Sequence, residues 1–309
     1  MPLETASRDQ YKKHRSLWNN AWRQFRRHHL AVAGLIVLII FVLLTFVGTP
    51  LYHTDKDYID FSVMSSTFSR DHPLGTDSLG RDILARMLWG GRISLAVGVI
   101  SAVVAIGLGT LVGALAGFFG GVLDNILMRT TDLFISLPVV PLLLLVSFLF
   151  RDSFQTFFDD RFNNGEIGIF ILIVLVISIL SWMTTARLVR ASFLSIKEKE
   201  YIEAARALGV SKTSIVFKHI LPNAISPIIV AATLAVGAAI ITESTLSFLG
   251  LGFPSDIPTW GAMLYDGRQR LQISPHESLI PGAAIFLTVL AINYIGDGLR
   301  DALDPRKSQ

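Results

Sequence analysis

The chain has 309 residues, of which 51% are hydrophobic and 17% are charged, and its formal net charge is +3. Soluble domains carry about 25% charged residues, so this composition favours a membrane protein over a soluble one. The small net charge argues against a nucleic-acid-binding protein. The chain contains no cysteine, which excludes disulfides, thiolate metal sites and thiol nucleophiles.

Six stretches of about 18 residues or more carry no charge, and each is long enough to cross the hydrocarbon core as a helix. A helix satisfies its backbone hydrogen bonds internally, as lipid requires. We therefore predict an all-α polytopic membrane protein with six transmembrane helices. The predicted spans are residues 30–48, 93–117, 133–150, 167–186, 221–242 and 278–296.

The N-terminal segment before the first span is basic and aromatic. Trp18, Trp22 and Phe25 share one helical face, and lysine and arginine residues surround them. This pattern predicts an amphipathic helix that contacts lipid headgroups; the alternative is a solvated basic tail. With the N-terminus inside, the predicted inner segments hold 18 of the 27 lysines and arginines, so we expect both termini in the cytoplasm.

The predicted domain organisation follows from these spans. It consists of a cytoplasmic basic segment at 1–29, a transmembrane domain at 30–300 and a cytoplasmic tail at 301–309. In the first outer segment, Asp77 is expected to cap a short surface helix that ends at Gly90 and Gly91. Its Arg81 and Asp82 could form a salt-bridge latch or a solvated face, and the sequence alone favours the solvated face.

Two spans contain residues that affect helix packing. Gly109, Gly113 and Gly117 recur at every fourth position of the second span, a stripe that lets another helix approach closely. Pro138 and Pro141 are expected to kink the third span. The alternative for both spans is that membrane helices are simply rich in glycine and proline.

The segment 187–222, between the fourth and fifth spans, predicts a cytoplasmic helix-turn-helix. Residues 198–208 are good helix formers, and Gly209 suits the position after a helix, where φ is positive. Ser211 can cap a second helix, which Pro222 would end. The hairpin could simply be solvated.

The same hairpin also has features of a docking site. Ala204 and Ala205 would leave a flat place for a partner, with the Glu203 carboxylate at its edge. The spacing of this Glu-Ala-Ala motif from Gly209, and the ending at Leu-Pro, resemble the EAA loop of ABC importer permeases, although His219 stands where the family has an aliphatic residue. The resemblance implies docking into a groove of a cytoplasmic ATPase subunit. It assigns this contact to Glu203, Ala204, Ala205, Gly209, Leu221 and Pro222.

Other motifs, in the same order along the chain, are similar to those of the C-type dipeptide and oligopeptide permeases. They begin at His72, Glu243 and Asn293 and extend the resemblance over nearly the whole chain. The resemblance implies a subunit of the bacterial inner membrane that forms half of a pathway for di- or oligopeptides. The implied partners are a homologous second permease, two ATPase subunits, an extracytoplasmic substrate-binding protein and membrane lipid. Nickel and glutathione are the alternative substrates.

The end of the fifth span carries an ionisable residue, which is a candidate functional group in a membrane protein. Glu243, together with Ser244 and Phe248, could line the pathway or contact the second permease. Glu243 could equally lie at the headgroup level as a surface residue.

Catalysis is not expected of this chain. It lacks a Walker A motif, a His-Glu-x-x-His helix and a Gly-x-Ser-x-Gly elbow, so ATP hydrolysis would fall to partner subunits. No cofactor or metal is expected. A self-powered secondary transporter is the alternative from another class, but it would need ionisable residues inside the spans, and these spans contain almost none.

Overall fold

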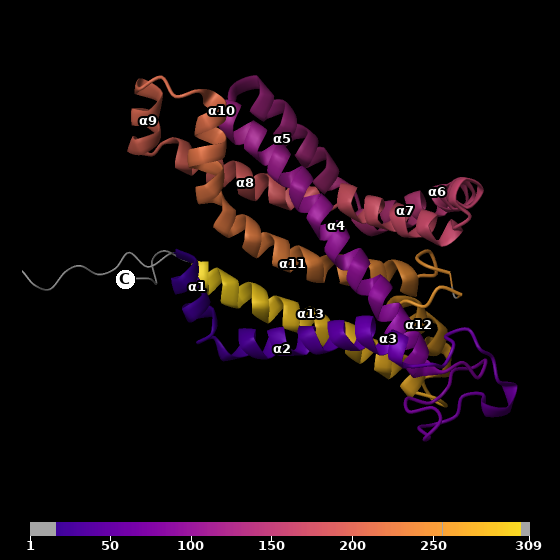
Figure 1. The fold of residues 1–309 in the computed structure, drawn as a ribbon. Coiled ribbons are helices and arrows are strands. Elements are labelled where there is room, and N and C mark those ends of the chain that lie inside the picture. The colour runs from indigo at the N-terminus through magenta and orange to yellow at the C-terminus, as the bar shows by residue number, and fades with distance from the viewer. Residues whose placement is uncertain (1–16, 255, 304–309) are drawn as a thin grey trace, which may run out of the picture.

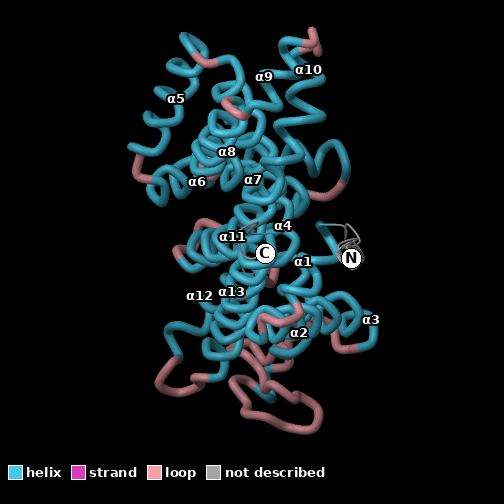
Figure 2. The backbone as a smooth tube through the Cα atoms, turned by 90° about the vertical axis from the view of Figure 1, so that its left-hand side faces the viewer, coloured by secondary structure: helices cyan, strands magenta, loops and turns pink. Residues whose placement is uncertain are grey.

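The computed structural model describes residues 17–254 and 256–303, and every regular element in these ranges is helical (Figure 2). The longer helices are α2 (His29–Leu43), α4 (Ile83–Phe119), α5 (Gly121–Ser136), α6 (Val139–Phe162), α7 (Gly165–Ile179), α8 (Trp182–Lys197), α11 (Leu221–Phe248) and α13 (His276–Leu303). The shorter ones are α1 (Leu17–Phe25), η1 (Leu44–Gly48), α3 (Thr49–Leu51), η2 (Phe61–Val63), α9 (Glu200–Ala207), α10 (Lys212–Ser214), η3 (Ile215–Ile220), α12 (Trp260–Gly267) and η4 (Arg268–Arg270).

The described residues contain up to six membrane spans. Five continuous helices are long and apolar enough to cross a bilayer, and α7 and α8, bent by 42° at their break, make a sixth if the pair counts as one span. This confirms the prediction of an all-α polytopic protein. The first span continues through the π-helical turn η1, where the Arg92 guanidinium donates to the carbonyl oxygens of Thr45 and Phe46 at 2.9 Å each.

The third span differs from its prediction. The apolar run 133–150 straddles two helices, because α5 ends at Ser136 and α6 begins at Val139. The break lies at Leu137, whose ψ is 141°, since the residue before a proline avoids helical geometry. The helix also extends beyond the predicted span: α6 continues to Phe162, and a left-handed Asn163 ends it.

The start of the second span was placed incorrectly as well. Asp77 does not cap a separate surface helix. The Asp82 carboxylate accepts from the Ala85 N–H at 2.8 Å and starts α4, which runs unbroken through Gly90 and Gly91 to Phe119. Glycines in a membrane helix need not end it where a neighbouring segment packs against them.

The glycine stripe of α4 packs directly against α8. A Cβ atom on Gly109 would lie 2.6 Å from the Trp182 carbonyl oxygen, and one on Gly113 would lie 2.4 Å from the Ala186 carbonyl oxygen. Only hydrogen fits at these places, so the two backbones touch. The stripe is therefore a specific packing seam and not a consequence of composition alone.

The helices form two groups with α11 between them (Figure 1). One group contains α5 to α8 and the other α1, α2 and α13, while α4 runs diagonally across both. We call the end that carries α9 and α10 the hairpin end, and the end that carries α12 and the segment 52–82 the loop end. The described part of the chain begins and finishes at the hairpin end (Figure 1).

The first helix, α1, packs against α2 and α13. The Phe25 side chain of α1 is 5% exposed and packs with Ala31 and Ala302, while Trp22 is 54% exposed. On the predicted apolar face, Phe25 therefore packs against the protein, and Trp22 remains exposed. The predicted helix at residues 11–16 and the Trp18 side chain lie outside what the structure describes.

Candidate functional site

The turn of the predicted helix-turn-helix is built by backbone hydrogen bonds. The Gly209 N–H donates to the Arg206 carbonyl and the Val210 N–H to the Ala205 carbonyl, which is the Schellman arrangement that closes a helix. It requires a left-handed residue, and Gly209 has φ +77°. The Ser211 hydroxyl then accepts from the Ser214 N–H and starts the next helix.

The second helix of the hairpin does not end at Pro222. It passes through the π-helical turn η3 and continues as α11, giving one helix from Lys212 to Phe248. Pro222 lies in the first turn of α11, and wider π-helical turns can precede a proline that cannot donate a hydrogen bond. The hairpin and the fifth span are therefore joined by one continuous helix, without an intervening loop.

The hairpin shares one hydrophobic core with the membrane helices. Ile202 of α9 and Ile220 of η3 are fully buried and belong to a cluster that includes Val189 and Phe193 of α8 and Phe118 of α4. Burying such side chains stabilises the arrangement by about 1.5–3 kcal/mol each. The hairpin is thus packed against the membrane helices through this shared core.

The structure separates the predicted docking residues into two sets. Glu203 and Ala204 are exposed, but Ala205 is 8% exposed and faces the interior, because adjacent residues of a helix point about 100° apart. Leu221 is half-buried and Pro222 exposed. Sequence reasoning missed Leu208, which is 84% exposed at the tip of the hairpin; an apolar residue just before the predicted turn was the available signal.

A cavity of about 840 Å³ lies between α4, α8, α11 and α13. Its walls are mainly apolar, and hydroxyl side chains from three helices interrupt them. On α11 the lining extends from Ser226 to Ala239, and on α4 it begins at Ser101, the midpoint of that helix. The cavity therefore runs from the hairpin end to just past the middle of α11 and does not reach the loop end.

Helix packing fills the loop half of the bundle around Glu243. The Glu243 carboxylate is fully buried and accepts from the hydroxyls of Ser247 at 2.8 Å and Ser94 at 3.3 Å. Ser94 in turn accepts from the Trp260 N–H at 3.2 Å, so one carboxylate joins α4, α11 and α12. The interpretation of Glu243 as a surface residue is wrong, and its part in the pathway stays a prediction.

The neighbours of Glu243 in the predicted site lie differently. Ser244 is 7% exposed, and a Cβ atom on Gly261 would lie 2.6 Å from its Cα atom, so α11 and α12 touch here. Phe248 is 38% exposed, and the Arg268 guanidinium lies over its ring at 5.8 Å. The structure thus groups Glu243 with Ser244 but leaves Phe248 at the surface.

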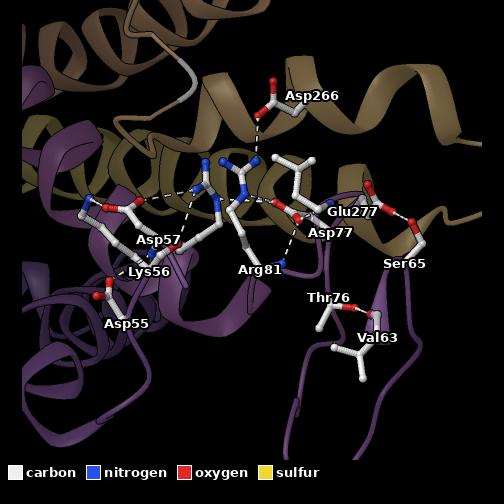
Figure 3. A network of polar contacts seen from close by, with 12 residues as sticks. Asp55, Lys56, Asp57, Val63, Ser65, Thr76, Asp77, Arg81, Asp266 and Glu277 are labelled. Atoms are coloured by element: carbon white, nitrogen blue, oxygen red, sulfur yellow. Dashed lines mark hydrogen bonds and ion pairs between the residues drawn. The ribbon is translucent and has the colours of Figure 1, made fainter. Parts of the chain in front are cut away.

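A buried ionic cluster lies at the loop end (Figure 3), where the sequence alone favours a solvated face. Arg81 and Arg86 are 9% and 1% exposed, so the segment is not a solvated face. Arg81 Nε lies 2.7 Å from Asp77 Oδ2, and Arg81 Nη2 lies 3.7 Å from Asp266 Oδ2 on α12. Arg86 Nη1 lies 3.9 Å from Asp57 Oδ1.

The cluster fastens the loop segment to two helices. It joins residues from the segment 52–82, from the start of α4 and from α12 (Figure 3). Burial raises the pKa of the Asp266 carboxyl, and the nearby Arg86 and Arg81 oppose this shift. No sequence spacing indicates the Asp266 contact, since it comes from a helix nearly 190 positions further along the chain.

Replacing Arg86 by methionine is expected to release the segment 52–82. The change removes a buried cation from carboxylates that remain, which costs about 3–5 kcal/mol for a buried pair. The measurement is the rate of limited proteolysis within this segment, which should rise at least tenfold. Arg70→Met, an exposed position of the same segment, is the matched control; equal protection of both variants would contradict a fastening role.

Comparison with known proteins places the chain in a family. Residues 109–309 match the family described as "Binding-protein-dependent transport system inner membrane component", and residues 16–68 match the "N-terminal TM domain of oligopeptide transport permease C". Both matches agree with the resemblance given by the sequence motifs. The first of them covers the α4–α8 seam from Gly109 onward, the hairpin and α11.

Curated relatives extend over almost the whole chain. The oligopeptide transport system permease protein OppC of Escherichia coli is 42% identical over 98% of this chain and 96% of its own length. The glutathione transport system permease protein GsiD of Pectobacterium atrosepticum is 40% identical over 96% and 93%. OppC of Haemophilus influenzae is 38% identical over 94% and 89%. The chain therefore belongs to the inner-membrane components of binding-protein-dependent transport systems, as a multi-pass ABC importer permease.

Proposed function

We propose that this chain is the transmembrane subunit of an ATP-driven importer of di- or oligopeptides. It forms half of the translocation pathway, a homologous second permease forms the other half, and two separate ATPase subunits drive it. The observation that carries the proposal is the hydrophobic core shared by α9, η3, α8 and α4. Through it, a force on the hairpin reaches two of the helices that line the cavity.

The orientation that we propose puts the hairpin end in the cytoplasm. The excess of lysine and arginine in the segments at this end supports the cytoplasmic orientation. Both described ends of the chain lie there as well (Figure 1). An ATPase can then bind the exposed Glu203, Ala204 and Leu208, while the substrate-binding protein approaches the loop end.

In this orientation the structure corresponds to an inward-facing state. The cavity extends from the hairpin end to just past the middle of α11, and the packing around Glu243 and Trp260 closes the loop end. Closure of the ATPases would carry the hairpin and tilt α11, so that the pathway opens outward. The two states must differ by only a few kcal/mol, or ATP and substrate could not shift the equilibrium between them.

The chain itself is proposed to be non-catalytic. Its sequence lacks a Walker A motif, so nucleotide binding and hydrolysis are assigned to the ATPase subunits. Peptides are the proposed substrates because one group of relatives is named for oligopeptide transport. Glutathione, itself a small peptide with charged ends, is the second candidate because GsiD proteins are similarly related.

Reconstitution of the whole complex in liposomes tests this function. With the second permease, the ATPases and the binding protein present, we expect uptake of a radiolabelled tripeptide that requires ATP. Glutathione and Ni²⁺, each measured with the same complex, compare the candidate substrates. Uptake by the lone chain that follows a proton gradient without ATP would contradict the proposal in favour of a secondary transporter.

A further inference from the structure

The cavity presents its polar groups in two zones. Hydroxyl side chains on α4, α8 and α11 and in the turn before α8 line the cavity, and Asp297 and Arg300 lie in the last two turns of α13, near the hairpin end. These two are the only charged side chains among the described residues that line it. The hydroxyl-bearing lining residues are Ser101, Ser181, Thr184, Thr185 and Ser226.

Asp297 and Arg300 carry opposite charges on one face of α13, since residues three apart on a helix are neighbours. Both are exposed to the cavity mouth. Within the described ranges, neither forms an ion pair closer than 4 Å, in contrast to Arg190 of α8, which pairs with Asp124. The cavity thus presents one carboxylate and one guanidinium, each without an ion-pair partner within 4 Å among the described residues.

The deeper wall also has unused hydrogen-bonding capacity. Ser101 is fully buried, and its Oγ has no hydrogen-bond partner in the described part of the chain. The Ser101 Oγ is shielded from the cavity, whereas the exposed Ser181 and Thr184 hydroxyls can be reached by an occupant. Hydroxyls both donate and accept, which suits the amide groups of a peptide of any sequence.

We propose that Asp297 and Arg300 form a binding subsite for a zwitterionic peptide as it leaves the cavity. Asp297 receives the α-ammonium group, Arg300 receives the α-carboxylate, and the hydroxyls bind backbone amides. The inference rests on the proposed function and adds a substrate class, namely a solute that carries both a positive and a negative charge. Weak, paired contacts at the exit attract the solute without retaining it.

The test combines charge-neutralised variants with capped substrates in the reconstituted complex. Arg300→Gln and Asp297→Asn are each assayed with a tripeptide that is free, N-acetylated or C-amidated, at saturating binding protein. Rates are divided by the wild-type rate for the same peptide, so that preferences of the binding protein cancel. Arg300→Gln should slow the free peptide roughly tenfold, the value of one charged hydrogen bond, and leave the amidated peptide unchanged. Asp297→Asn should slow the free peptide to a similar extent and leave the N-acetylated peptide unchanged.

Controls separate this subsite from general effects. Arg129→Gln and Asp160→Asn remove exposed charges that do not line the cavity and should leave every relative rate near one. If Arg300→Gln and Asp297→Asn slow capped and free peptides equally, or slow none, the subsite is overturned while ATP-driven uptake by the wild type still supports the proposed function. Absence of ATP-driven uptake of every peptide by the wild type would overturn both.

Discussion

Substitution of Gly113 by leucine is expected to abolish accumulation of the folded protein. A Cβ atom there would lie 2.4 Å from the Ala186 carbonyl oxygen and 2.8 Å from the Val189 Cβ atom. Because the first of these is backbone, α4 and α8 must separate along their whole seam, at a cost of about 3 kcal/mol or more. The measurement is the monodisperse peak in fluorescence-detected size-exclusion chromatography after mild solubilisation.

The matched control for this experiment lies on the same helix. Gly107 is exposed, and a Cβ atom on it would meet nothing within 4 Å. Gly107→Leu should therefore retain the wild-type peak, because helix propensity favours leucine over glycine. A normal peak for Gly113→Leu would show that α4 and α8 are not in backbone contact.

Substitution of Gly209 by valine is expected to abolish ATP-driven uptake and leave the protein inserted and folded. With φ at +77°, a β-branched residue is strained by about 1–3 kcal/mol, so the Schellman turn rearranges and α9 shifts. The bundle itself should survive, since a Cβ atom at this position would meet nothing within 4 Å. Uptake in reconstituted liposomes should fall below about a tenth of the wild-type rate, and ATP hydrolysis should lose its stimulation by substrate, since a 1.4 kcal/mol change is already tenfold.

The Gly209→Asn variant separates the effect of backbone conformation from the effect of side-chain size. Asn tolerates left-handed geometry far better than valine does, so Gly209→Asn should keep most of the uptake. Equal loss in both variants would assign the effect to the side chain and not to the turn. Wild-type uptake by Gly209→Val would contradict the proposed coupling role of the hairpin.

The hairpin was predictable because its turn is determined locally. The helix formers before Gly209, the glycine itself and the capping Ser211 lie within a short stretch, and the backbone bonds that they favour do not depend on distant residues. Local sequence could not predict that the Ala205 side chain faces the interior. Whether a small residue faces a partner or the interior depends on where α8 and η3 pack against α9.

The third span shows where an apolar run misleads. Hydropathy reports which residues tolerate lipid, but the ends of a helix depend on caps and on proline geometry. Leu137 and Pro138 stand inside the apolar run, and they separate α5 from α6. The charged stretch that follows remained helical because α7 packs antiparallel against it, with Gly168 in contact with the Phe154 carbonyl.

The sequence alone determined the membrane class, the glycine stripe and the turn at Gly209, because lipid solvation and local backbone preference act within single segments. Tertiary structure alone decided which polar residues are buried together. Glu243 reaches Ser94 on another helix, and Arg81 reaches Asp266 on α12, contacts that need helices distant in the chain to meet. The cavity arises in the same way, since its wall combines residues of α4, α7, α8, α11 and α13 and no single segment encodes it.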